Sequence, residues 1–261
     1  MAADPDRLLV DGDPPPVRVL LPAGASDLLL VADHAGRAIP RRLGDLGLPQ
    51  SERLRHIAWD IGIAGVTEQL AQALDATAIL QAYSRLVIDC NRQPGWASSI
   101  PTISELTEIP GNRHLLPAER EARRREIFLP YHRRIAEMLD RRRSAGRRSV
   151  LIAMHSFTPV FKGEPRDIHV GILYNRDRRL ADIMLELLRA EGDLAVGDNA
   201  PYAITDQSDY TVPTHGEARG LGHVEIEIRQ DLIGDPAGQA SWAARLARLL
   251  PLADERLCAG D

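Results

Sequence analysis

The sequence predicts a single α/β domain with a mixed, mostly parallel sheet covered by helices on both faces. Short apolar runs alternate along the chain with longer segments of helical periodicity. Strands that alternate with helices in this way indicate a parallel sheet buried on both sides. The 261 residues are enough to bury one full core, and no repeat or linker divides them. We therefore expect one domain over residues 26–261, preceded by an extended Pro- and Asp-rich segment at residues 1–25.

The first half of the domain contains three expected strands and one expected helix. Residues 28–32 form an apolar run typical of a buried strand. A helix is expected from Asp60 to Asp75, followed by strands at 77–80 and 86–90. Residues 93–116 contain three prolines and two glycines, which predicts a long irregular loop. Loops of this length in compact domains are usually functional or disordered.

The second half continues the alternation. Residues 118–148 combine apolar residues near helical spacing with many arginines and interspersed acids, which predicts a long amphipathic helix with a salt-bridged outer face. The remaining expected elements are strands at 149–154, 168–174 and 223–229, helices at 178–191 and 236–250, and a loop at 197–217.

Composition excludes several classes of protein. The net charge is −5, the apolar content is 44%, and no apolar run approaches the ~20 residues of a membrane helix. No basic and then apolar leader is visible at the N-terminus. Cys90 and Cys258 form no CxxC pair, as expected of thiols in a cytoplasmic protein, and Cys90 is interpreted as core packing.

The arginine-rich segment 118–148 raises nucleic-acid binding as an alternative. No recognition motif accompanies the charge, so a solvated helix face explains it better. We expect a small-molecule partner and neither nucleic acid nor membrane. The sequence does not indicate an oligomeric state.

Two histidines follow strong strand patterns. His34 comes just after the run 28–32, and His155 ends the run that starts at Val150. The carboxyl ends of parallel strands meet at one edge of a sheet, where ligand sites lie. Zinc favours imidazole and carboxylate ligands, and catalytic sites keep three of them. A hydrogen-bonded structural role is the alternative for either histidine. As third ligand we prefer Asp60 to His56, although Asp60 can equally cap a helix.

Glu225 and Glu227 lie two residues apart in an apolar strand, so both point to the same face. A carboxylate buried in such a strand is costly unless it is paired or functional. Pairing with Arg229 or another arginine is one interpretation, and a general base that deprotonates water at a metal is the other.

Three further features have two interpretations each. Asn91 and Arg92 are suited to gripping a carboxylate, but a structural ion pair would look the same. His215, in a loop beside Gly216, contacts substrate or orients a neighbour, or else is a surface histidine. Neither Ser84 nor Ser156 has the Gly-x-Ser-x-Gly pattern of a nucleophile elbow, so a serine hydrolase is not expected.

Taken in order, these residues resemble the N-formylglutamate amidohydrolase family. The resemblance covers about residues 28–250, and it rests on five motifs in the correct order. The motifs are Asp33-His34-Ala35-Gly36 with Ile39-Pro40, the stretch from Tyr83 to Arg92, His155-Ser156, the stretch from Tyr210 to Gly216, and Glu225 to Gln230. That family is similar in turn to the zinc carboxypeptidases, which implies a fold of the zinc carboxypeptidase or phosphorylase/hydrolase type.

The resemblance implies a zinc-dependent amide hydrolase of N-acyl amino acids, most directly of N-formyl-L-glutamate to glutamate and formate. It implies one zinc ion per chain, held by His155 with His34 and Asp60. Glu227 would be the general base, and Arg85 or the zinc would stabilise the oxyanion. Asn91 and Arg92 would bind the substrate carboxylate, and His215 would contact the substrate or orient a neighbour.

One position departs from the carboxypeptidase pattern. There the first ligands are spaced His-x-x-Glu, whereas His34 is followed by Arg37 in the fourth position. Another acid therefore completes the site, or the metal is absent. Two alternatives stay open: a related amidase or carboxypeptidase-like hydrolase of another N-acyl or peptide substrate, and a metal-free protein that binds an acidic metabolite.

Overall fold

A seven-stranded sheet forms the centre of the protein, whose structure, a computed structural model, describes residues 7–260. The strand order is β1-β3-β2-β6-β11-β9-β10, and only β1 with β3 and β9 with β11 pair antiparallel. The predicted mixed, mostly parallel sheet is therefore confirmed. Its strands are β1 (Val17–Leu20), β2 (Leu28–Ala32), β3 (Thr77–Gln81), β6 (Val150–Phe157), β9 (Val170–Leu173), β10 (Val196–Asp198) and β11 (Gly222–Arg229).

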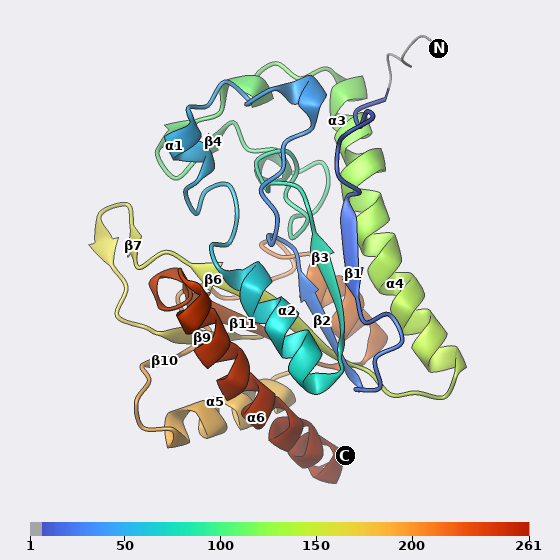
Figure 1. Cartoon of the computed structure of the whole chain (residues 1–261), viewed down its shortest axis with the longest axis vertical. Coiled ribbons are helices and arrows are strands. Elements are labelled where there is room, and N and C mark those ends of the chain that lie inside the picture. The colour runs from blue at the N-terminus through green and yellow to red at the C-terminus, as the bar shows by residue number, and fades with distance from the viewer. Residues whose placement is uncertain (1–6, 261) are drawn as a thin grey trace.

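Helices cover both faces of this sheet (Figure 1). On one face lie α2 (Ile63–Leu74), α5 (Arg179–Ala190) and α6 (Pro236–Gly260), which share a core with the sheet. On the other face lies α4 (Leu129–Ser144), reached through α3 (Pro117–Arg123) and a π-helical turn. The smaller elements are α1 (Gln50–Arg53) and two hairpins, β4 (Ile103–Ser104) with β5 (Thr107–Glu108) and β7 (Val160–Phe161) with β8 (Glu164–Pro165).

The central strands are buried on both faces, as their unbroken apolar runs predict. In β2, Leu28 and Leu30 face the α2 side, and Leu29 and Val31 face the α4 side. Among the described residues, no helix is long and apolar enough to cross a membrane.

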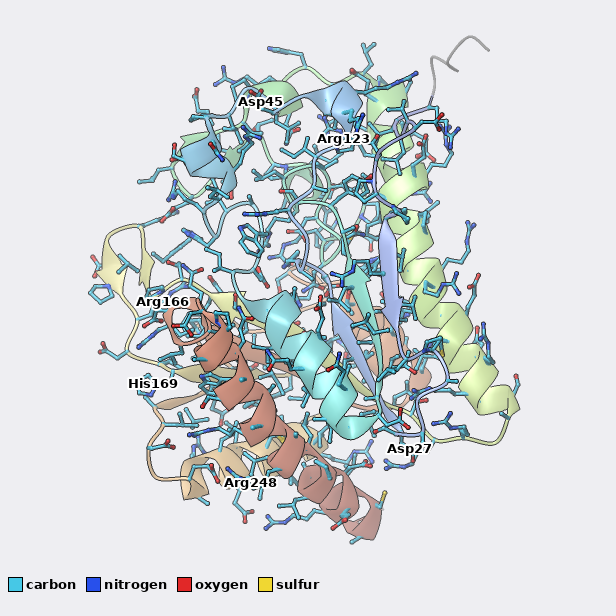
Figure 2. All side chains as sticks on the ribbon, in the orientation of Figure 1. Asp27, Asp45, Arg123, Arg166, His169 and Arg248 are labelled. Carbon is cyan, nitrogen blue, oxygen red and sulfur yellow. The ribbon has the colours of Figure 1, made fainter. Side chains whose placement is uncertain are left out.

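The predicted strand at 86–90 is wrong. Residues 85–87 form a turn, and Leu86, Val87 and Ile88 are buried in the core beside α4. Side chains satisfy their backbone carbonyls: Asn112 Nδ2 donates to Leu86 O at 2.8 Å, and the buried Arg123, whose position Figure 2 labels, donates from Nη1 to Val87 O at 2.9 Å. The prediction that Leu86, Val87 and Ile88 are buried is correct. A short apolar run does not reveal, however, which groups form hydrogen bonds with its backbone carbonyls.

Several boundaries also differ from the prediction. The helix α6 continues past Pro251 to Gly260, because Ala253 and Leu257 pack into the core. The stabilisation from this packing offsets the loss of the helix hydrogen bond that Pro251 cannot form. Two short strands of the sheet were not predicted: β1 pairs with β3 at one edge, and β10 lies partly in the expected loop 197–217. The two hairpins outside the sheet were not predicted either, and β4 and β5 lie in the expected loop 93–116. The helix expected from Asp60 begins at Ile63 instead.

Candidate active site

A cavity of about 660 Å³ opens at the edge of the sheet where β2, β3, β6 and β11 end. Every predicted site residue except His215 lines it. The charged and imidazole side chains that line the cavity are His34, His56, Asp60, Arg85, Asp89, Arg92, Glu105, His155, Asp209, Glu225 and Glu227. The residues gather because their strands run parallel and end together, as the sequence predicts.

His34, Asp60 and His155 form a buried cluster that can hold a metal ion, since one ligand atom from each lies within 4.8 Å of the others. Asp60 Oδ2 lies 2.9 Å from His155 Nδ1 and 3.5 Å from His34 Nδ1. His34 Nδ1 has no hydrogen-bond partner among the described residues. An unpartnered buried nitrogen is rare in native proteins and calls for an explanation such as an ion. The donor set of two imidazoles and a carboxylate fits zinc.

Asp60 does not cap a helix, so that alternative is wrong. Gly62 precedes α2 and supplies no side-chain cap, and the Asp60 carboxylate accepts a hydrogen bond from Ser156 N at 3.2 Å. Arg37, which departs from the carboxypeptidase pattern, packs over the Trp59 ring at 5.2 Å and does not line the cavity. The carboxylate that lies beside the two imidazoles is therefore that of Asp60.

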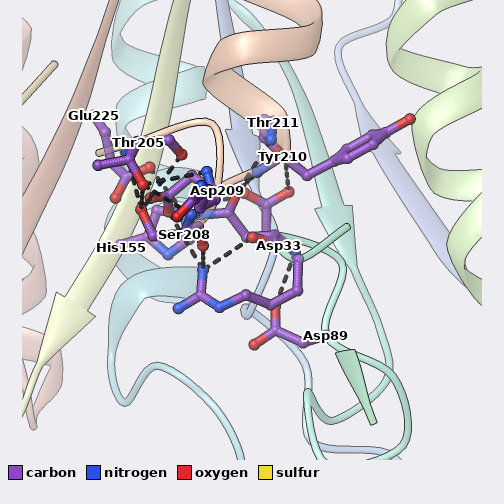
Figure 3. Close-up of polar contacts among 12 residues, drawn as sticks. Asp33, Asp89, His155, Thr205, Ser208, Asp209, Tyr210, Thr211 and Glu225 are labelled. Atoms are coloured by element: carbon purple, nitrogen blue, oxygen red, sulfur yellow. Dashed lines mark hydrogen bonds and ion pairs between the residues drawn. The ribbon is translucent and has the colours of Figure 1, made fainter. Parts of the chain in front are cut away.

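Two further carboxylates, which sequence reasoning did not assign, hold the other sides of the imidazoles. His34 Nε2 lies 2.7 Å from Asp89 Oδ1, and His155 Nε2 lies 3.1 Å from Asp33 Oδ2. Asp33 in turn accepts a hydrogen bond from Thr211 Oγ1 at 2.7 Å (Figure 3). With Nε2 of each ring held by an outer carboxylate, Nδ1 of each ring faces Asp60, and a metal ion there would take the place of the proton that Asp60 accepts from His155 Nδ1. The sequence did contain both carboxylates in its motifs, since Asp33 directly precedes His34 and Asp89 lies in the stretch from Tyr83 to Arg92.

The charges in this cluster stabilise one another. Burial alone would raise the pKa of Asp33, but the hydrogen bond and positive charge of His155 lower it to about 2. The pKa values of Asp60 and Asp89 also lie below their ordinary range, because nearby cationic groups outweigh burial. Conversely, the surrounding carboxylates raise the pKa values of His34 and His155 against the effect of burial. The carboxylates thus attract positive charge to this point, whether a proton or a metal ion provides it.

Gly36 allows the loop after β2 to reach this position. A Cβ atom at residue 36 would lie 2.0 Å from Ala82 O. The backbones of the two segments therefore approach too closely for any side chain, and Ala38 bridges to Tyr83 just beyond. This contact ties the loop that carries His34 to the segment that leads to Arg85.

Glu225 and Glu227 lie side by side on the face of β11 that lines the cavity, whereas Ile226 and Ile228 pack into the opposite core. Both carboxylates are buried, and each has an oxygen without a hydrogen-bond partner among the described residues. Pairing with Arg229 is excluded, because Arg229 binds Asp231 at 2.8 Å.

Burial raises the pKa of Glu227 to about 7 and that of Glu225 well above its ordinary value. Glu227 stands opposite His155 in the register of β11 and β6. A buried carboxyl with a pKa near 7 is suited to accepting and returning a proton.

Asn91 and Arg92 line the cavity but also hold the loop at 208–211. Asn91 Oδ1 accepts hydrogen bonds from Tyr210 N and Thr211 N at 3.0 Å, and its Nδ2 donates to Asp209 at 2.8 Å. Arg92 Nη1 donates to Ser208 O and lies 3.4 Å from Asp209 Oδ1. The structural role is therefore present whether or not these residues also bind a substrate.

Arg85 is bound between two acids. Its Nη2 donates to Asp89 Oδ2 at 2.7 Å, and its Nη1 lies 3.7 Å from Asp60 Oδ1. The guanidinium thus lies beside the candidate metal site, and its positive charge is shared between Asp89 and Asp60.

The structure does not bring His215 or His56 to the candidate metal site. His215 is buried outside the cavity, and its Nε2 lies 3.0 Å from Nδ1 of His132. Its interpretation as a surface histidine is wrong, and it contacts a neighbouring side chain instead. His56 lines the cavity 3.5 Å from Glu105 and does not belong to the metal cluster.

The chain is similar to known proteins along most of its length. The family model described as N-formylglutamate amidohydrolase matches residues 26–234. The structure of gene product Atu2144 from Agrobacterium tumefaciens is 41% identical with a TM-score of 0.93, covering 96% of this chain and 99% of that one. N-formylglutamate amidohydrolase from Ralstonia eutropha JMP134 is 22% identical with a TM-score of 0.70, covering 95% of this chain and 100% of that one. No curated protein matches the chain.

Proposed function

The chain belongs to the N-formylglutamate amidohydrolase family and is a hydrolase of amide bonds, and from this premise we propose a metal-dependent hydrolysis of N-acyl amino acids. One observation carries the proposal: His34, Asp60 and His155 converge beside the buried Glu227. N-formyl-L-glutamate, cleaved to glutamate and formate, is the first candidate substrate, because the matching family model and the Ralstonia relative are described by it.

The proposed metal is one zinc ion per chain. His34 and His155 would hold it through Nδ1 and Asp60 through its carboxylate, a donor set that zinc hydrolases use. When bound, zinc polarises an acyl carbonyl and increases the acidity of water.

Glu227 is the proposed general base. It takes a proton from the attacking water and returns it to the nitrogen of the leaving amino acid. Its pKa of about 7 allows both transfers near neutral pH. Water attacks the acyl carbon, the C–N bond breaks, and the acyl group leaves as a carboxylic acid.

Arg85 and the segment Asn91-Arg92 have proposed roles in charge stabilisation and binding. Arg85 lies beside Asp60 and would stabilise negative charge on the acyl oxygen as it develops. Arg92 lines the cavity with a quarter of its side chain exposed, so it can still meet a substrate carboxylate. Asn91 would orient Arg92 and the loop at 208–211. A cytoplasmic location stays a prediction.

Metal analysis and formate release test this proposal. The native protein and a His155→Ala variant are prepared without chelators, and their zinc content is measured by elemental analysis. We expect about one zinc per chain in the native protein, as in other catalytic zinc sites, and its loss in the variant. The loaded protein is then assayed for formate release from N-formyl-L-glutamate. A native protein that binds no zinc even after reconstitution would refute the mechanism and favour a metal-free binding protein.

A further inference from the structure

A second pocket, of about 220 Å³, lies at the end of the sheet opposite to the candidate active site. Ser149 directly precedes β6 and residues 220–222 lead into β11, so the pocket forms where these two parallel strands begin. Asp27, labelled in Figure 2, lies at this same end, where its O accepts a hydrogen bond from Val150 N at 3.0 Å. His155 is six residues beyond Ser149, which corresponds to roughly 20 Å along a strand. The two sites are therefore separate.

Five arginines line this pocket, and no acidic residue among the described ones does. They come from three segments that are distant in the sequence: Arg143, Arg147 and Arg148 from α4 and the loop after it, Arg179 from the start of α5, and Arg219 from the turn before β11. The arginine-rich segment 118–148 thus contributes three of the five. Guanidinium groups that line one concavity from separate segments favour an anion there, whereas a solvated helix face carries its charges outward.

Three of these arginines have one carboxylate between them. Arg143 and Arg219 share Asp140, whose Oδ1 lies 3.4 Å from Arg143 Nη2 and 2.7 Å from Arg219 Nη1. Arg147 Nη2 donates to the backbone carbonyls of residues 24–26 at 2.9–3.1 Å. Within residues 7–260, no ion pair joins Arg147 to a carboxylate. Part of the positive charge at the pocket is therefore not neutralised by the protein.

The other two arginines are paired with acids that lie outside the pocket. Arg148 pairs with Asp254 and, at 3.5 Å, with Asp27. Arg179 pairs with Asp177 at 2.9 Å. None of these acids lines the pocket, so an anion that enters it meets guanidinium groups and no carboxylate.

Ser149 gives independent support for a ligand. It is only 6% exposed and lines the pocket, and its Oγ has no hydrogen-bond partner among the described residues. A buried hydroxyl without a partner is costly, and most buried hydroxyls in native proteins have one. The buried Leu139 and Leu257 also line the pocket and, being apolar, cannot supply one. An oxygen atom of a bound anion would accept the hydrogen bond of this hydroxyl.

We propose that this pocket binds the phosphate group of a small molecule, either inorganic phosphate or a phosphate monoester. The oxygens of a phosphate point in tetrahedral directions, so arginines from three segments and a hydroxyl can reach it from different sides, whereas the two oxygens of a carboxylate lie in one plane. Its charge of about −2 near neutral pH suits a site lined by several guanidinium groups. A pocket of this size fits one phosphate group rather than the repeated phosphates of a nucleic acid. The inference is independent of the proposed function.

Calorimetric titration tests the site. Inorganic phosphate and glycerol 3-phosphate are the probes, and the protein is metal-free so that no metal ion binds them. Succinate is the comparison ligand, because it is also a dianion but carries planar carboxylates. The variants are Arg143→Gln, Arg219→Gln and Ser149→Ala, and thermal unfolding without ligand establishes that each is folded.

Arg134→Gln is the matched control. Arg134 also lies on α4 and, like Arg143, pairs with an acid three residues away, Glu137 at 3.8 Å. It does not line the pocket, so its replacement removes a helix charge without touching the site.

We expect the wild type and Arg134→Gln to bind the phosphate probes, and to bind succinate more weakly. Arg219→Gln should weaken phosphate binding about 10-fold, and Arg143→Gln, whose side chain is more exposed, about 3-fold. Ser149→Ala should weaken it about 3- to 10-fold without lowering the thermal stability of the ligand-free protein, because Oγ has no protein partner to lose. Tighter binding of glycerol 3-phosphate than of phosphate would identify an ester as the ligand class, and the reverse would identify free phosphate.

Four results would overturn the site. They are a wild type that binds neither phosphate probe at millimolar concentration, pocket variants that keep the wild-type affinity, succinate that binds as tightly as phosphate, and binding of a short DNA duplex in place of the small probes. Failure of the proposed hydrolysis would leave this test unchanged, because the titration requires neither metal nor turnover.

Discussion

The buried pair of His132 and His215 predicts a specific loss of stability in acid. Burial lowers the pKa of His215 from 6.5 to about 3, and repulsion from His132, when that ring is protonated, and from Arg219 adds to this effect. Burial also lowers the pKa of His132 to about 4. Each histidine is therefore neutral in the folded protein at pH values where the unfolded chain is already protonated. The stability that a group with a lowered pKa contributes is present above its ordinary pKa and is lost as the pH falls toward the folded value.

The magnitude follows from the two pKa values of His215. At pH 5, about 1.5 pH units below its ordinary value, the unfolded chain binds a proton at His215 and the folded protein does not. At about 1.36 kcal/mol per pH unit, His215 alone accounts for about 2 kcal/mol of lost stability between pH 8 and pH 5. Glutamine does not titrate, so a His215→Gln variant should lose about 2 kcal/mol less than the wild type over the same interval.

Urea unfolding of the metal-free protein at pH 8 and pH 5 measures this difference. The substitution weakens the hydrogen bond to His132 at both pH values. This effect on stability therefore cancels when the two pH values are compared. His114→Gln, at an exposed position, is the control and should leave the pH dependence of the wild type unchanged. An equal loss of stability in wild type and His215→Gln would show that His215 is protonated in the folded protein, which would refute the reasoning.

Three further predictions concern the site. Glu227→Gln should keep the metal but lower kcat for formate release by about 10²- to 10⁴-fold, as expected for a lost general base; near-normal turnover would remove Glu227 from that role. Asp33→Asn should weaken zinc binding about 10- to 100-fold in a chelator competition, because Asp33 orients His155; unchanged affinity would show that the ring is held by other contacts. Gly36→Ala should cost about 1–3 kcal/mol in urea unfolding, since the new Cβ would meet Ala82 O at 2.0 Å; wild-type stability would show that the two segments separate without cost.

Much of the fold could be predicted because the central strands are buried on both faces. An unbroken apolar run such as 150–154 has few structural solutions when helical segments flank it. The edges of the sheet were harder. β1 is only partly buried and carries Arg18, so its sequence does not differ from that of a surface segment. The predicted strand at 86–90 was wrong although the run is apolar at its start and buried. Its carbonyls accept hydrogen bonds from Asn112 and Arg123, which are distant in sequence, and not from a neighbouring strand.

The sequence identified the residues of the candidate metal site but not the contacts that hold them in place. Strand ends identified His34 and His155, and Asp60 followed from chemistry and resemblance. The outer carboxylates Asp33 and Asp89 could not be assigned, since their roles depend on which ring nitrogen each one meets. His215 was misplaced because a loop sequence does not show that its histidine turns inward to contact His132.

The position of β6 has a consequence for how the protein opens. This strand is the middle one of seven and all eight of its residues are buried; it pairs with β11 from Val150 to Phe157 and with β2 from Val150 to Ala153. Edge strands β1 and β10 can fray by breaking pairs on one side, whereas β6 can be exposed only when pairs on both sides are broken. The amide of Ile152, in the part of β6 that is paired on both sides, should therefore exchange with solvent only through global unfolding, much more slowly than amides of β1 or β10.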